Sequence, residues 1–193
     1  METKVKFNED YSESDKDYLK DAINFYLEQM NFEEYSSKLY ISFVDRIGAT
    51  TTITADDPET QTVYTQGLCK YISPDLFFVS ILSTQTHENH IKTLFHELCH
   101  VHQYVAGKQK IDNYGRTIWN NSIPYPKIQN AAYQDYLNLP WEIEAREHEE
   151  IYYAKWREVE KRMNKKKLWY VKLLDKAFNI VVYCVTSWKK DTK

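Results

Sequence analysis

The chain has 193 residues, of which 42% are hydrophobic and 27% are charged, a size and composition typical of one globular domain with a buried core. The 16 Tyr, 8 Phe and 5 Trp, set against only 4 Gly and 5 Pro, exclude a disordered or low-complexity chain. The formal net charge of −3 conceals an asymmetry: residues 1–154 carry 13 Lys and Arg against 24 Asp and Glu, whereas residues 155–193 carry 12 against 4, which predicts an acidic body and a basic extension.

The first half of the sequence predicts one helix and three strands. Apolar residues recur at helical spacing over residues 14–30, which predicts an amphipathic helix. Strands are predicted at residues 39–44, 67–72 and 76–82. The third of these is apolar on both faces, which predicts a strand covered on two sides. Residues 46–58 are rich in Thr, with Asp and Pro, and predict a loop or hairpin.

The second half is predicted to be mainly helical. One helix begins near Thr86 and ends near Gly107, because glycine favours the left-handed conformation that closes a helix. Residues 108–139 show no sustained period and predict irregular structure or short helices. Two further helical segments are predicted, one over residues 140–163 with Pro in its first turn and one over residues 167–188. These elements together predict an α+β fold.

The cysteines and the apolar runs indicate the compartment. Cys69, Cys99 and Cys184 are far apart and form no CxxC pair, which argues against a disulfide framework and against a cysteine zinc site. No apolar run approaches the roughly 20 residues that a transmembrane helix needs. The N-terminal sequence also lacks the apolar segment of a secretory signal. We therefore expect a cytoplasmic protein.

The helix predicted near residues 86–107 carries the motif His96-Glu97-Leu98-Cys99-His100. His96 and His100 lie one helical turn apart on the same face, so both imidazoles can bind one metal ion. Glu97 lies beside this face, where its carboxylate can accept a proton from a water that the metal activates. The alternative is that all three are ordinary exposed helix residues. Apolar residues fall on the opposite side of the helix and predict its buried face: Ile91, Leu94, Phe95, Leu98, Val101 and Val105.

The motif helix does not supply an obvious third ligand, although catalytic zinc usually takes three protein ligands. Gln103 and Ala106 occupy the positions where a longer motif of this type carries Gly and a third His. His102 projects toward the apolar flank and is expected to be structural. His87 and His90 lie near the helix start, where we expect capping or exposure to solvent.

Two glutamates of the next helix, Glu142 and Glu144, are the better candidates for the third ligand, with a solvated helix face as the alternative. HELCHVHQ at residues 96–103, followed by PWEIEA at residues 140–145, resembles the zincin metallopeptidases whose third ligand is a glutamate, the gluzincins. The sequence is most similar to small metallopeptidases, many of them phage-encoded, that combine these two motifs with Gly-x-Cys before a strand. The resemblance covers residues 39–150.

The resemblance implies a minimal zincin-like domain over residues 1–154, with a small mixed sheet packed on the motif helix. It implies a zinc peptidase in which Zn²⁺ is held by His96, His100 and Glu142, with Glu144 as a second choice for the last ligand. Four residues after the ligand, the family carries Asp or Asn, whereas this chain carries Arg146. The residue that supports the ligands is therefore not predicted.

The resemblance also implies how the site would act. Glu97 would be the general base that passes a proton from water to the leaving amine. A Tyr could stabilise the oxyanion, and Tyr125, Tyr133 and Tyr136 are candidates that could equally be packing residues. The strand at residues 76–82 would form the sheet edge and pair with an extended peptide or protein substrate.

Two other functions are alternatives to a zinc peptidase. A zincin scaffold could serve as a host-modulating interaction protein with little or no turnover, but the intact Glu97 argues against it. Glu97 and His100 also form an ExxH pair, as in di-metal helical proteins, yet the second ExxH that such sites need is absent from the sequence.

The basic extension is amphipathic over residues 167–188, with lysines on one side and apolar residues on the other. Such a helix can lie on an acidic membrane, bind nucleic acid or pack on its own domain. We predict packing on the acidic body and no nucleic-acid partner. The sequence gives no indication of the oligomeric state.

Overall fold

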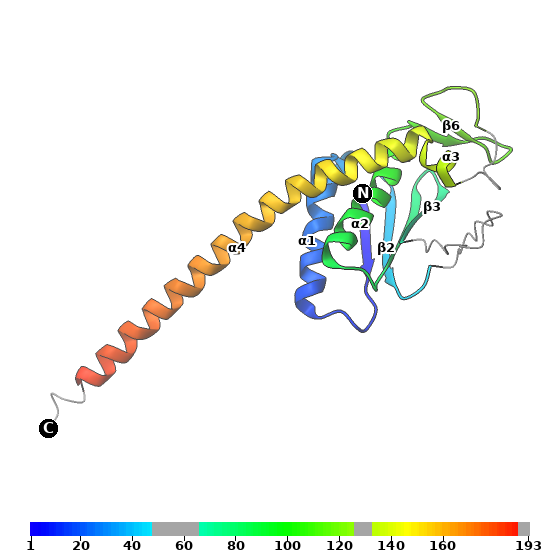
Figure 1. Ribbon diagram of the computed structural model, residues 1–193. Helices are drawn as coiled ribbons and strands as arrows, with labels where there is room; N and C mark the ends of the chain where they lie inside the picture. The colour runs from blue at the N-terminus through cyan, green and yellow to red at the C-terminus, as the bar shows by residue number, and fades with distance from the viewer. Residues whose placement is uncertain (48–65, 126–132, 189–193) are drawn as a thin grey trace. The chain divides into compact units, whose positions relative to one another are not determined.

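The computed structural model describes residues 1–47, 66–125 and 133–188 and has an α+β fold (Figure 1). The chain forms two compact units, Met1–Tyr153 and Ala154–Lys193. The predicted packing of the basic extension on the acidic body stays a prediction. Most of the loop predicted at residues 46–58 lies outside the described residues.

The first unit contains a small mixed sheet, as the resemblance implies, but with four strands where the sequence predicts three. Its strands are β1 (Glu2–Lys6), β2 (Lys38–Val44), β3 (Gly67–Ser73) and β4 (Leu76–Leu82), in the spatial order β1-β2-β4-β3. β1 is parallel to β2 and β2 is parallel to β4, whereas β3 and β4 are antiparallel. β1 was not predicted, because it is a short edge strand in which no residue is buried and so no hydrophobic alternation reveals it.

Two predictions about the strand at residues 76–82 are wrong. β4 lies between β2 and β3, so it is not an edge strand. Only the turn residues Pro74 and Asp75 separate β3 from β4, so the two form a hairpin and β3 takes the edge. β4 also buries only one face: Phe78 on the other face is 40% exposed and stacks on Tyr40, with ring centroids 5.0 Å apart. This aromatic pair, rather than a second layer, accounts for the apolar residues on both faces.

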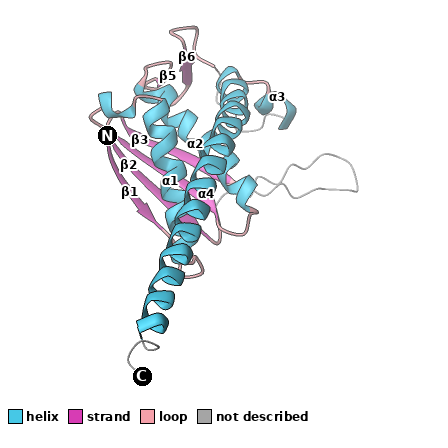
Figure 2. Cartoon of the chain, turned by 90° about the vertical axis from the view of Figure 1, so that its left-hand side faces the viewer, coloured by secondary structure: helices cyan, strands magenta, loops and turns pink. Residues whose placement is uncertain are grey.

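Two helices cover the buried face of the sheet (Figure 2). α1 (Glu13–Gln29) begins after Ser12, whose side chain accepts a hydrogen bond from the Asp15 backbone N–H at 3.1 Å. α2 (His87–Val105) begins after Thr86 in the same way and ends before Gly107, which has a left-handed φ of 72°. Both helices confirm the predictions to within two residues. The core between helices and sheet is formed by apolar side chains that include Leu19, Ile23, Tyr26, Leu39, Ile41, Phe77, Val79, Ile81, Leu94 and Leu98.

The remaining elements follow α2 in the chain, apart from a short 3₁₀ helix, η1 (Phe32–Glu34), after α1. The segment predicted to be irregular contains the hairpin of β5 (Gln109–Ile111) and β6 (Thr117–Trp119), and the short helix α3 (Tyr133–Leu137).

The two helical segments predicted after residue 140 are one helix, α4 (Pro140–Trp188). The boundary was wrong because residues 164–166 are Asn, Lys and Lys, which change the charge pattern but contain no helix breaker. Within the part of the chain that the structure describes, no helix is long and apolar enough to cross a membrane.

Candidate metal centre

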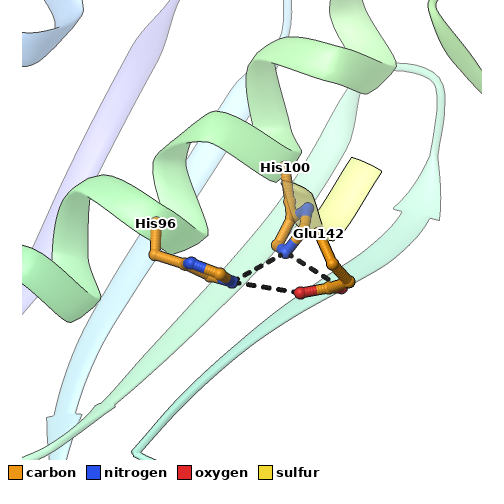
Figure 3. Close-up of side chains that lie close together, drawn as sticks. All are labelled: His96, His100 and Glu142. Carbon is orange, nitrogen blue, oxygen red and sulfur yellow. Dashed lines mark hydrogen bonds and ion pairs between the residues drawn. The ribbon is translucent and has the colours of Figure 1, made fainter. Parts of the chain in front are cut away.

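Two helices bring the candidate ligands together. α2 buries its apolar side in the core and presents His96 and His100 on its other side. α4 places Glu142 in its first turn, where the carboxylate reaches both imidazoles (Figure 3). Glu142 is buried, as is His100, whereas the side chain of His96 retains 17% exposure. The cluster is therefore enclosed but reachable from solvent on the His96 side.

The three side chains place their donor atoms close enough together to bind one metal ion. His96 Nε2 lies 3.2 Å from His100 Nε2 and 3.3 Å from Glu142 Oε2, and His100 Nε2 lies 3.4 Å from Glu142 Oε1. Donor atoms around a tetrahedral zinc ion lie about 3.3–3.4 Å apart, and each of these contacts is near that value, with the two contacts of Glu142 made by different carboxylate oxygens. Among the described residues, these three form the one group of His, Cys, Asp or Glu side chains that could hold a metal ion. Their chemistry and spacing both fit Zn²⁺.

The electrostatics of the cluster couple the three groups. Burial alone would raise the pKa of the Glu142 carboxyl, but hydrogen bonds from His100, His96 and Tyr136 hold it well below its usual range. Burial opposes protonation of His96, yet the carboxylates of Glu142 and Glu149 outweigh it and raise its pKa to about 10. The pKa of His100 is also raised, because Glu142 outweighs burial. The carboxylates around the two imidazoles thus favour a positive charge at this position.

Each imidazole also has a polar partner at Nδ1, the ring nitrogen that faces away from the cluster. His96 Nδ1 lies 3.3 Å from Glu149 Oε2, and His100 Nδ1 lies 2.9 Å from Gln103 Oε1. Hydrogen bonds to the second ring nitrogen orient metal-binding histidines and fix which nitrogen faces the metal. Neither partner was predicted. Helical spacing could have indicated Glu149, because it lies seven residues after Glu142 on the same face of α4.

Arg146, which departs from the motif that the sequence resembles, contacts neither imidazole through any hydrogen bond or ion pair that the structure describes. Its guanidinium donates to the Leu137 backbone carbonyl and so links α4 to the end of α3. Arg146 therefore supports the turn that leads into the first residues of α4, and Glu149 is the carboxylate of this helix that lies beside His96 Nδ1.

Glu97 is held beside the centre, close to the edge strand β3. It is only 6% exposed, and the backbone N–H of Cys69 donates a hydrogen bond to its carboxylate. Burial raises the pKa of Glu97, although His100 and His96 partly oppose the shift. Glu97 is therefore a buried carboxylate, held beside His96 and His100, whose protonated form is more favoured than in an exposed glutamate.

Gly67 makes this close approach possible. A Cβ at this position would lie 2.5 Å from Thr93 Cγ2 and 2.6 Å from Glu97 Oε1. We expect Gly67→Ala to lower the free energy of unfolding by about 1–3 kcal/mol through overpacking, and to displace Glu97. Chemical denaturation measures the first effect. Leu68→Ala, at a 39% exposed position of the same strand, is the control, and a Gly67→Ala variant as stable as wild type would contradict the tight contact.

The fallback ligand and the tyrosine candidates take different positions. Glu144 points to Lys108 and Gln103 instead of the imidazoles. Tyr136 is the tyrosine whose hydroxyl donates to Glu142. Tyr125 packs edge-on against Trp141, with ring centroids 5.1 Å apart. The side chain of Tyr133 lies outside the described residues.

The other histidines lie outside the cluster. His102 packs between Phe32 and Tyr35, and burial lowers its pKa to about 4. His87 is exposed, as expected. The expectation for His90 was wrong: it is buried, with Nε2 3.0 Å from the Leu82 carbonyl oxygen, because α2 starts against the end of β4.

Comparison with known proteins does not assign a family. No protein-family model matches this chain, and no curated protein or solved structure matches it. The function must therefore be inferred from the geometry and chemistry of the site.

Proposed function

We propose that the protein is a zinc-dependent peptidase of the zincin type, with Zn²⁺ held by His96, His100 and Glu142. The observation that carries this proposal is the convergence of His96, His100 and Glu142 on one point beside the buried carboxylate of Glu97. A purely structural metal site has no need of such a carboxylate. When bound, the ion supplies Lewis acidity, which activates water and polarises a carbonyl group.

Glu97 handles the protons of the reaction. Its carboxylate accepts a proton from the attacking water and then delivers it to the leaving amine. Burial raises its pKa, which brings its basicity closer to the pH at which the enzyme works. The Cys69 N–H fixes the carboxylate, so Glu97 needs little reorganisation between the two proton transfers.

The edge strand β3 indicates a peptide or protein substrate. The Leu82 N–H donates to the Gln66 carbonyl, so the backbone groups of residues 66, 68 and 70 face β4 and those of residues 67, 69 and 71 face outward. An extended peptide pairing with this outer edge would pass beside Cys69 and hence beside Glu97. The proposal thus keeps edge-strand recognition but transfers it from residues 76–82 to β3.

Tyr136 is the proposed donor to the oxyanion that forms on the substrate carbonyl. Its hydroxyl already reaches Glu142, and its side chain is 40% exposed, so it can turn toward a substrate. We expect Tyr136→Phe to lower kcat by about 100-fold at saturating zinc, as loss of one such donor typically does. Steady-state kinetics on a fluorogenic peptide measure this effect. Tyr125→Phe is the control, and a Tyr136→Phe variant with the wild-type kcat would assign the role elsewhere.

Metal analysis together with a peptidase assay tests the proposed function. We expect one zinc ion per purified chain and hydrolysis of unstructured peptides. Chelation should remove the zinc and abolish hydrolysis, and adding Zn²⁺ should restore both. A chain without stoichiometric metal would refute the site. Stoichiometric zinc with no hydrolysis of any peptide or protein substrate would instead favour an interaction protein built on the same scaffold.

A further inference from the structure

Gln103 is the fully buried side chain that joins the two helices of the metal centre. It lies on α2, three residues after His100, and none of its surface is exposed. Its Oε1 lies 2.9 Å from His100 Nδ1, and its Nε2 lies 2.9 Å from the Trp141 carbonyl oxygen and 3.0 Å from Glu144 Oε2. Every polar atom of this amide therefore has a partner.

These partners determine how the amide is oriented. The Trp141 carbonyl and the Glu144 carboxylate are acceptors only, so both require the NH₂ group of Gln103. The amide oxygen must then face His100, and His100 Nδ1 must be the donor. A neutral imidazole that carries its proton on Nδ1 has its lone pair on Nε2. Nε2 is the atom that faces His96 and Glu142.

The same amide also fixes the third ligand. Trp141 and Glu144 lie on either side of Glu142 in the chain, so the two hydrogen bonds from Gln103 hold the first turn of α4 against α2. Lys108 forms an ion pair with Glu144 and keeps that carboxylate in place. One side chain thus contacts a ligand on α2 and the turn that carries a ligand on α4.

We propose that Gln103 is a positioning residue of the metal centre. It holds His100 in the tautomer that offers Nε2 to the metal and holds the first turn of α4 so that Glu142 reaches both imidazoles. This inference rests on the proposed function, because it assigns a role toward the zinc ion. The amide oxygen of Gln103 is a neutral acceptor for His100 Nδ1, whereas His96 Nδ1 faces the carboxylate of Glu149.

Zinc affinity, measured by competition with a chromophoric chelator, tests the role of Gln103. We expect Gln103→Leu to weaken zinc binding by about 10–100-fold, the usual effect of losing a partner of a metal-binding histidine. Gln109→Leu is the matched control, because Gln109 is a buried glutamine outside the centre and its loss should leave zinc affinity unchanged. Equal zinc affinity in Gln103→Leu and wild type would overturn the inference.

A charge swap tests the hydrogen-bond assignment in a chain that keeps its core volume. Gln103→Glu alone places two carboxylates together at Glu144 and should weaken zinc binding. Adding Glu144→Gln places an amide NH₂ group at position 144, which donates to the new carboxylate at position 103. That carboxylate still accepts the hydrogen bond from His100. We expect the double variant to recover part of the lost affinity, because the clash with position 144 is relieved while the new carboxylate still faces the Trp141 carbonyl oxygen. A double variant weaker than Gln103→Glu would overturn the assignment.

The proton on His100 Nδ1 gives an independent readout. In the zinc-loaded wild type it should give a slowly exchanging NMR signal, because it is buried and hydrogen-bonded. In Gln103→Leu this signal should exchange rapidly, and retention of slow exchange would contradict the proposed contact. Failure of the wild type to bind zinc would refute the proposed function itself, a result distinct from each of these.

Discussion

Glu97→Gln is expected to lower kcat/KM for peptide hydrolysis by about 100–10,000-fold, the range that a general base contributes. Glutamine keeps the size of the side chain and can still accept the Cys69 N–H, but it cannot take a proton from water. Because Glu97 is not one of the three donors, we expect the variant to retain stoichiometric zinc. Kinetics on a fluorogenic peptide, combined with metal analysis of the same preparation, measure both properties.

The control for Glu97→Gln is the same chemical change on the surface. Glu150→Gln removes a carboxylate whose side chain is 65% exposed and pairs with Lys92. Such exposed pairs contribute little to stability, so activity and zinc content should match wild type. Full activity in Glu97→Gln would exclude Glu97 as the base. Loss of zinc in Glu97→Gln would show that Glu97 binds the metal.

Glu142→Gln is expected to weaken zinc binding by more than about 100-fold, since losing even a supporting partner of a ligand typically costs 10–100-fold. An amide is a poor zinc ligand and cannot neutralise the charge of the ion. Activity at low zinc concentration should be lost accordingly. Titration with zinc in the presence of a competing chelator measures the affinity.

Glu144→Gln separates the two glutamates of this turn. Glu144 faces Lys108 and Gln103, so its amide variant should retain far more zinc affinity than Glu142→Gln. The opposite ranking of the two variants would identify Glu144 as the ligand and contradict the observed orientation of the turn.

The parts of the fold that depend on local signals could be predicted from the sequence. α1 and α2 have apolar periodicity and a capping Ser12 or Thr86, which act within a few residues. Strand pairing is not local, so the sequence did not indicate that β2 occupies one side of β4 or that β1 exists. The length of α4 was predicted wrongly because the change from acidic to basic residues resembles a helix boundary. No residue at that point breaks the helix.

The site, like the fold, could be predicted only where the signal in the sequence is local. The spacing of His96 and His100 within one helix is local, and the position of Glu142 was expected from the resemblance of two motifs. Gln103 and Glu149 escaped prediction because their partners depend on how α2 and the first turn of α4 meet. The contact of Arg146 with the Leu137 carbonyl was not predicted for the same reason, because it depends on how α3 and α4 meet.

The raised pKa of His96 bears on how the chain folds before it meets a metal. A protonated imidazole between Glu142 and Glu149 neutralises a buried negative charge, so the metal-free protein carries its own counter-ion. This stabilisation is fully present below the unfolded histidine pKa of 6.5 and is lost as pH rises through about 10. The Glu142 contribution is present above the unfolded carboxyl pKa of 4.5 and is lost on acidification. Between those limits the proton on His96 balances the charge of the carboxylates, so under the proposed function a zinc ion would replace this proton when it binds.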